Sequence, residues 1–219
     1  MQRLLEKELE DESNFNALIY AFKAGEISVL PFLHTHILIA DAFSHRAVNL
    51  IQIMRQVNDG SALGVLVSSM EMLNGVAQNI SSESALLGKK FWPGPLTMIL
   101  QTNEMLNWDL GDGGAGEFVV RIPESELLRK VISKVGPVVF ANANLIGAGP
   151  IKDLNNLAFD SKDLAYIVQG ENLLDQEIKS TLIKENRGVA QNIEIVRVGK
   201  IPEIEIENFL STLDSTDPT

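Results

Sequence analysis

The stretch Lys90-Phe91-Trp92-Pro93-Gly94-Pro95-Leu96-Thr97-Met98-Ile99-Leu100 predicts the centre of the fold. Each proline fixes its φ angle, and the glycine between them tolerates conformations that other residues resist, so Trp92–Pro95 is predicted to be a rigid turn. The apolar run after it has the length and composition of a strand buried inside a sheet. We therefore expect a helix that ends near Lys90, a stiff turn, and an interior strand over Thr97–Leu100.

Apolar periodicity and turn-forming residues predict the elements on either side of this stretch. Helices are expected at 1–12, 14–23, 44–55, 70–77, 82–90, 123–134 and 201–213. Strands are expected at 27–32, 34–40, 63–67, 97–100, 117–122, 137–140, 163–168 and 193–198, with turns at 58–61 and 141–144 and a flexible glycine-rich connection at 109–116. Because helices and strands alternate irregularly, the predicted fold class is α/β (α+β), a mixed sheet covered by helices.

Length and composition predict one globular domain. The chain has 219 residues, 45% of them hydrophobic, and a mean hydropathy of +0.09, which is enough for a substantial core. The predicted organisation is a charged helical lead-in over 1–13, a single domain over 14–213 and a disordered tail over 214–219. Apolar runs are far shorter than the ~18 residues of a membrane span. The charged first residues lack the apolar region of a signal peptide, so a cytoplasmic location is expected.

Charge and cysteine content exclude several kinds of site. The chain has no cysteine, which excludes disulfides, thiolate metal sites and a cysteine nucleophile. Its formal net charge is −11 and its pI is about 4.7. A strongly acidic protein repels phosphate backbones, whose binding depends on clustered lysine and arginine. Direct nucleic-acid binding is therefore disfavoured.

Five segments in order along the chain carry a family resemblance. They are Lys90–Leu100, Arg121-Ile122-Pro123, Val138–Gly147, Lys179-Ser180-Thr181 and Val196-Arg197-Val198-Gly199. Together they resemble the YrdC/YciO family, the threonylcarbamoyl-AMP synthases. The resemblance extends from about residue 16 to residue 201 and implies a YrdC-like twisted mixed sheet with a concave ligand-binding face.

The resemblance also implies a reaction. Family enzymes are nucleotidyltransferases that combine threonine, bicarbonate and ATP into threonylcarbamoyl-AMP and pyrophosphate, and their product feeds the threonylcarbamoyladenosine modification of tRNA. The implied ligands of this chain are therefore threonine, bicarbonate and ATP with Mg²⁺, with tRNA-modification proteins as possible partners. On the amino-acid side, the family pattern implies that Arg121 holds the threonine carboxylate, with Ser180 and His34 nearby.

On the nucleotide side, the family pattern implies roles for four further residues. Arg55, Asn142, Asn144 and Arg197 would contact ATP, and Arg55 and Asn144 occupy positions that matter for catalysis. Each of these residues also has a purely structural interpretation. An arginine at a helix end complements the helix dipole, asparagines satisfy backbone groups in tight turns, and Arg121 alone would be read as a surface ion-pairing residue.

The chain departs from the family where the chemistry is concentrated. The family's Pro-Thr-Asp/Glu-Thr-x-Tyr-Gly-Leu is replaced by residues 31–38, its Lys-x-Arg by Arg55-Gln56-Val57, and its Ser-x-Asn by Asn142-Ala143-Asn144. Arginine and lysine are not equivalent at a phosphate site. Two functions stay open: a synthase with weakened or altered activity, and a non-catalytic protein that binds a nucleotide, a small ligand or a protein partner. A third, double-stranded RNA binding, conflicts with the net charge.

Two histidines lie two residues apart. On a strand, His34 and His36 would share one face, where they could bind a metal with Asp41 or line a remodelled pocket. A metal site needs further ligands of the right type, and no cysteine or third nearby histidine is present. No metal is therefore expected.

Overall fold

The computed structural model of the protein describes residues 1–57, 60–114, 116–145, 147–159, 161–186 and 193–214. Its strands are β1 Gln2–Leu5, β2 Ile27–Phe32, β3 Thr35–Asp41, β4 Gly64–Leu66, β5 Leu96–Gln101, β6 Glu117–Arg121, β7 Val138–Asn142, β8 Leu164–Gln169, β9 Thr181–Glu185 and β10 Ile193–Arg197. Its α-helices are α1 Glu12–Lys23, α2 His45–Arg55, α3 Met70–Val76, α4 Ser82–Phe91, α5 Glu126–Val135 and α6 Glu203–Asp214. Short 3-10 helices cover Glu6–Glu10, Leu154–Asn156 and Ser161–Asp163.

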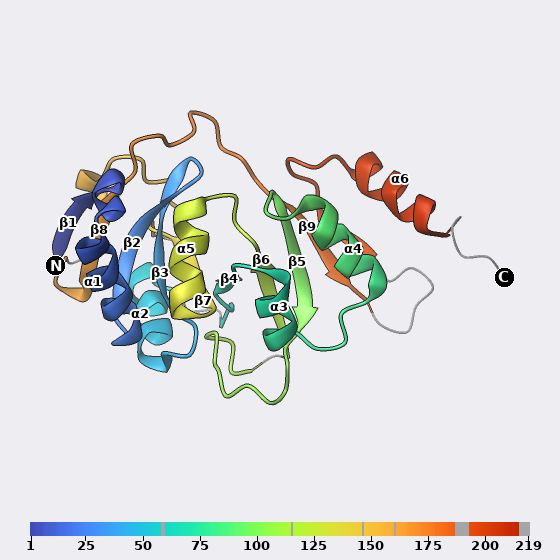
Figure 1. Ribbon diagram of the computed structural model, residues 1–219, viewed down its shortest axis with the longest axis horizontal. Coiled ribbons are helices and arrows are strands. Elements are labelled where there is room, and N and C mark those ends of the chain that lie inside the picture. The colour runs from blue at the N-terminus through green and yellow to red at the C-terminus, as the bar shows by residue number, and fades with distance from the viewer. Residues whose placement is uncertain (58–59, 115, 146, 160, 187–192, 215–219) are drawn as a thin grey trace.

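Within the described residues, ten strands form one mixed sheet in the order β1-β8-β2-β3-β7-β4-β6-β5-β9-β10. Strands joined by short connections pair antiparallel, as in β2 with β3 and β9 with β10. Parallel pairs join segments far apart in the chain: β8 lies between β1 and β2, and β5 lies beside β9. Figure 1 shows the sheet crossing the molecule from β1 to β9, with the segment after β8 passing above β2 and β3 on its way to β9.

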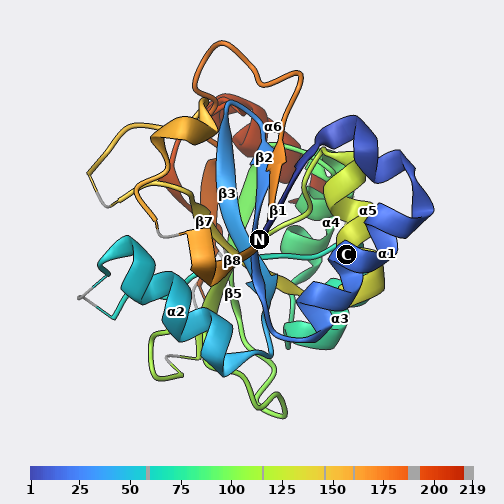
Figure 2. The same cartoon turned by 90° about the vertical axis from the view of Figure 1, so that its left-hand side faces the viewer.

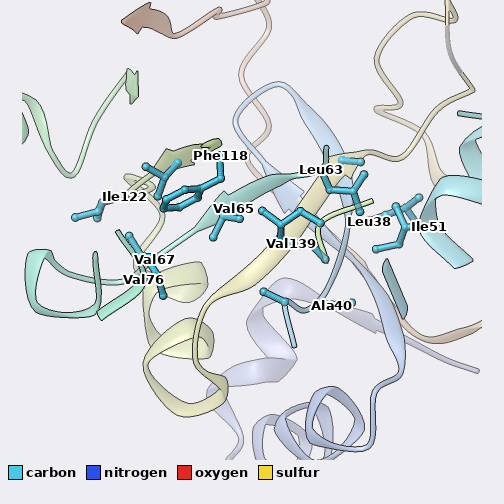
Figure 3. Packing of buried hydrophobic residues seen from close by; sticks show 14 of the residues in the cluster. Leu38, Ala40, Ile51, Leu63, Val65, Val67, Val76, Phe118, Ile122 and Val139 are labelled. Carbon is cyan, nitrogen blue, oxygen red and sulfur yellow. The ribbon is translucent and has the colours of Figure 1, made fainter. Parts of the chain in front are cut away.

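Helices cover both faces of the sheet. Alternate residues of β2 and β3 enter different apolar clusters, as the two-residue period of a strand requires: Val29 and Leu38 in one, Leu30 and Ile37 in the other. The buried sides of α1 and α5 belong to the second cluster, and α2, α3 and α4 contribute to the first. Figure 2 shows α2 on one side of β2 and β3 with α1 and α5 on the other. Figure 3 shows residues of the first cluster packing around Val65 and Val139 of the adjacent strands β4 and β7.

The proline–glycine turn is the structural junction that its sequence predicts. Helix α4 ends at Phe91, and the Trp92–Pro93 peptide bond is cis. A Cβ at Gly94 would overlap the backbone oxygen of Phe91, so only glycine fits there. Gly94 N–H donates to the backbone oxygen of Ile122 (3.1 Å), and the Pro95 carbonyl accepts from Thr181 N–H (2.9 Å). The turn thereby connects three strands, β5, β6 and β9.

The predicted elements agree with the structure except at a few places. Residues 2–5 form strand β1 and not the predicted helix, because they pair with the otherwise free edge of β8. Strand β9 was not predicted, and α5 begins at Glu126 and not at Pro123, because the Ser125 hydroxyl accepts from Leu128 N–H and caps the helix there. Strand β2 continues through Pro31, which lies beyond its pairing with β8. The turn predicted at 58–61 and the tail predicted at 214–219 lie largely outside the described residues.

Candidate functional site

Arg121 is a buried cation at the end of β6. Its side chain is 5% exposed, and its guanidinium lies over the Phe32 ring at 5.2 Å. Nε donates to the backbone oxygen of Gly94 (2.8 Å) and Nη2 donates to the Glu124 carboxylate (2.6 Å). Burial lowers the pKa of Arg121 and Glu124 raises it, but an arginine of such high intrinsic pKa keeps its charge. The proline–glycine turn therefore positions the cation that the sequence singled out.

Two hydroxyls and a second guanidinium form a hydrogen-bonded group on the neighbouring strands β5, β9 and β10. Thr97 Oγ1–H donates to Ser180 Oγ (2.7 Å), and Arg197 Nη2 donates to Ser180 Oγ (3.3 Å) and to the Ser180 carbonyl (3.1 Å). Ser180 Oγ therefore contacts both the Thr97 hydroxyl and the Arg197 guanidinium. Ser180 is 8% exposed, whereas Arg197 is exposed.

Strand register joins these residues to Arg121. The pairing of β5 with β6 extends as far as Met98 opposite Val120, so Thr97 and Arg121 are the next residues on two adjacent antiparallel strands. Arg121, Thr97, Ser180 and Arg197 form what we call the Arg121 cluster. Its members come from four adjacent strands or their ends, β6, β5, β9 and β10, in a sheet whose order brings distant segments together.

Arg55 and Asn144 form a second group. Arg55 ends helix α2 and its Nε donates to the backbone oxygen of Asn144 (3.2 Å). Burial lowers the pKa of Arg55. Asn144 is 7% exposed; its Nδ2 donates to the carbonyls of Ala148 (2.6 Å) and Gly149 (3.0 Å). Its buried Oδ1 has no hydrogen-bond partner among the described residues, so one buried acceptor is left for a ligand or a water. Asn142, at the end of β7, is exposed.

His34 and His36 do not share a strand face. Leu33, with φ of 55°, and His34 form the turn between β2 and β3, where His34 Nδ1 accepts from Ile178 N–H (3.2 Å). His36 is fully buried in β3: Nδ1 donates to the Ile151 carbonyl (2.9 Å) and Nε2 accepts from Gly170 N–H (3.2 Å). Burial lowers the pKa of both histidines. His36 thus holds two loops to the sheet, with both nitrogens occupied by backbone groups.

Sequence reasoning missed some of the residues around Arg121. Thr97 was read as part of a buried strand, and Gly94 as a turn former. The sequence motifs do not include Glu124, although an acidic residue three positions after Arg121 is a pattern that indicates an ion pair. Phe32 and Arg121 are 89 residues apart in the sequence, so no local pattern links the two.

The described residues contain neither a metal-binding group of side chains nor a membrane-spanning helix. No group of three or more His, Asp or Glu side chains among them is arranged to hold a metal ion. None of the helices in the described part of the chain combines the length and the apolar character needed to cross a membrane.

Comparison with known proteins identifies relatives of this chain. The family model Sua5_yciO_yrdC, described as "Telomere recombination", matches residues 20–199. A Mycobacterium leprae protein provisionally named a threonylcarbamoyl-AMP synthase is 25% identical over 198 residues, 90% of this chain and 88% of that protein. A threonylcarbamoyl-AMP synthase of Pyrococcus abyssi is 27% identical over 194 residues, 87% of this chain but 55% of the relative, so the chain spans about half of that protein's length.

Solved structures show the same fold. P. abyssi Sua5, crystallised in complex with L-threonine, superposes with a TM-score of 0.79 at 25% identity, covering 94% of this chain and 59% of that one. Escherichia coli YciO superposes with a TM-score of 0.74 at 18% identity, covering 88% of this chain and 92% of that one. The predicted fold class, a YrdC-like mixed sheet covered by helices, is therefore confirmed. With a family model matched over most of its length and the fold of two solved members, this chain belongs to the Sua5/YciO/YrdC family.

Proposed function

We propose that the protein is an L-threonylcarbamoyladenylate synthase, which joins threonine, bicarbonate and ATP and releases pyrophosphate. The observation that supports this most is the Arg121 cluster: two guanidinium groups and two hydroxyls carried by four adjacent strands or their ends. Relatives of similar fold are named threonylcarbamoyl-AMP synthases, and one was solved with L-threonine.

The cluster offers the groups that an amino-acid carboxylate needs. A guanidinium binds a carboxylate through a planar pair of N–H donors, and Arg121 is held for this by Gly94 and by the Phe32 ring. The Ser180 hydroxyl would contact the same ligand. His34 lies close to this region, since it accepts from Ile178, two residues before Ser180. Its proposed contact with the amino acid rests on that position.

The nucleotide side of the proposed site has fewer cations. Arg197 is exposed and could neutralise phosphate oxygens, and Asn144 Oδ1 is a buried acceptor without a described partner. Arg55 would contribute through the N–H groups that remain beside its bond to Asn144, and exposed Asn142 lies at the same end of β7. ATP enters the proposed reaction with Mg²⁺. Positioning and charge neutralisation of a polyphosphate beside a carbamate would supply the catalysis, with no protein nucleophile.

A second candidate function is ligand binding without turnover. Arg55 donates to a backbone carbonyl and is half-buried, as a purely structural arginine would be. Val57, two residues later, supplies no charge where the family pattern has a cation. Loss of one phosphate-binding cation would remove transition-state stabilisation on the order of a few kcal/mol. Under this alternative the protein binds its ligands but releases no pyrophosphate.

The test is pyrophosphate release from MgATP, measured with and without threonine and bicarbonate. A synthase requires both substrates for release, and Arg121→Ala should then reduce the rate at least about 100-fold, in line with the loss of a charged contact. Arg46→Ala, which removes an exposed cation from α2, is the control and should leave the rate unchanged. Pyrophosphate release that does not depend on threonine would contradict the proposal, as would an Arg121→Ala variant that folds and keeps full activity. Saturable MgATP binding without any release would support the second function.

A further inference from the structure

We propose that Glu124 is an internal competitor for the carboxylate site on Arg121. Its carboxylate accepts a hydrogen bond from Nη2 of Arg121, and a ligand carboxylate binds by displacing it. The inference rests on the proposed function, because it assumes that Arg121 receives a carboxylate ligand. It adds a residue that sets how tightly such a ligand is held.

Arg121 is a cation that needs a partner at all times. Its side chain is 5% exposed, and an unpaired charge at such a position is strongly destabilising. Gly94 supplies a neutral carbonyl and Phe32 a ring face. Glu124 supplies the formal negative charge, through a 2.6 Å contact to Nη2. A ligand carboxylate that replaces Glu124 exchanges one anion for another, so the buried cation stays paired throughout.

Glu124 is placed so that its carboxylate can leave. Its side chain is 37% exposed, against 5% for Arg121. It lies in the connection between β6 and α5, before the helix begins. The backbone of this connection is fixed separately, because Arg129 Nη1 donates to the carbonyls of Pro123 (2.8 Å) and Glu124 (2.6 Å). The carboxylate can therefore rotate into solvent while the main chain that carries it stays in place.

Competition follows from the burial of the Arg121 guanidinium and the partial exposure of the Glu124 carboxylate. With Glu124 in place the guanidinium is almost completely covered, so a ligand gains its contact to Nη2 only after the glutamate has left. A group tethered three residues away has a high effective concentration at the arginine. The measured affinity for a carboxylate ligand is then the intrinsic affinity reduced by the strength of the internal pair. Removing the charge of Glu124 while keeping its shape should therefore tighten ligand binding.

The test compares L-threonine binding to the wild type, Glu124→Gln and Glu126→Gln by isothermal titration calorimetry. Glu124→Gln should lower the Kd about fivefold, the upper value that a partly exposed ion pair contributes. Glu126→Gln makes the same change of net charge two residues away, at an exposed position on the first turn of α5. It should leave the Kd within about twofold, since a screened charge at that range contributes little. An unchanged or weaker affinity in Glu124→Gln would overturn the proposal.

Acetate, a carboxylate without the amino and hydroxyl groups, separates this inference from the proposed function. If Glu124→Gln binds acetate more tightly than the wild type but neither protein binds threonine, competition by Glu124 stands and the threonine-dependent function fails. If the wild type binds threonine and Glu124→Gln shows no gain for either ligand, the function stands and competition fails. If Glu124→Gln gains no affinity for either ligand and the wild type binds neither, both ideas are overturned. Thermal unfolding of each variant checks that the fold is intact.

Discussion

Replacing His36 by glutamine should remove a pH dependence from the stability of the fold. His36 is fully buried and neutral, with Nδ1 donating to Ile151 and Nε2 accepting from Gly170. Protonation of Nε2 would point an N–H at the N–H of Gly170 and break that contact. Burial is the main reason why the pKa of His36 is lowered in the folded protein. The unfolded chain, with a histidine pKa of about 6.5, takes up the proton first as the pH falls.

The sign and size of the effect follow from proton linkage. Above pH 6.5 neither state is protonated at His36 and the full stabilisation is present. Below pH 6.5, and down to the lowered pKa of the folded state, only the unfolded state binds the proton. The free energy of unfolding then falls by an amount that approaches about 1.4 kcal/mol per pH unit. Glutamine offers one donor and one acceptor in its side chain but does not titrate, so its variant lacks this slope.

The assay is urea unfolding at half-unit steps from pH 7.5 to pH 5. Other groups titrate in the same range, among them His34, whose pKa is also lowered by burial, so the informative quantity is the wild-type free energy minus that of His36→Gln. This difference should shrink with falling pH below 6.5. His45→Gln, the same change at an exposed residue on α2, controls for loss of a histidine as such. A difference that stays constant from pH 7.5 to pH 5 would refute the reasoning.

Three further substitutions test the packing that supports the site. Thr97→Val, which removes one of the two hydrogen-bond partners of the buried Ser180 hydroxyl, should lower the free energy of unfolding by about 1–2 kcal/mol. Thr97→Ser should recover most of this loss in the same denaturation assay. Gly199→Ala would put a Cβ 2.5 Å from the Ser180 carbonyl and should lower the free energy of unfolding by about 1–3 kcal/mol. Gly75→Ala, in open space on helix α3, should raise the free energy of unfolding by about 0.5–1 kcal/mol. Equal effects of the two substitutions would contradict this geometry. Phe118→Ala, at a 1% exposed ring packed edge-on against Trp108, should lower the free energy of unfolding by about 3–5 kcal/mol, and a loss below 1 kcal/mol would contradict its assignment to the core.

Elements specified by local chemistry could be predicted from the sequence. The proline–glycine turn and the helix capped by Ser44 depend on residues close together in the chain. Strand β1 could not be predicted, because its four residues, Gln2–Leu5, become a strand only through pairing with β8. Strand β9 alternates too briefly to stand out from its flanking loops. Both failures concern pairings between segments that are distant in sequence.

In the candidate site, too, local sequence patterns identify residues but do not reveal contacts between distant segments. The sequence motifs selected Arg121, Ser180 and Arg197, and in the structure Arg197 donates to Ser180 while Arg121 lies on the neighbouring part of the same sheet. They did not show that Arg121 is already paired with Glu124, nor that Arg55 is engaged by a backbone carbonyl. Such facts depend on tertiary contacts, and a motif does not contain them. Whether these residues bind the proposed ligands remains the prediction that the binding and pyrophosphate assays test.

The order of the strands also has a consequence for how the chain folds as it is synthesised. Gln2, made long before Tyr166, pairs with that residue of β8, and the second residue of β5, Thr97, pairs with Leu182 of β9. At about 5–20 residues per second, β1 leaves the ribosome many seconds before its partner exists. The hairpin of β2 and β3, whose strands are adjacent in the chain, can form early, whereas the outer strand β1 must wait. Distant pairings of this kind slow folding, so we expect β1 to be the element most exposed to chaperones and proteases before synthesis reaches β8.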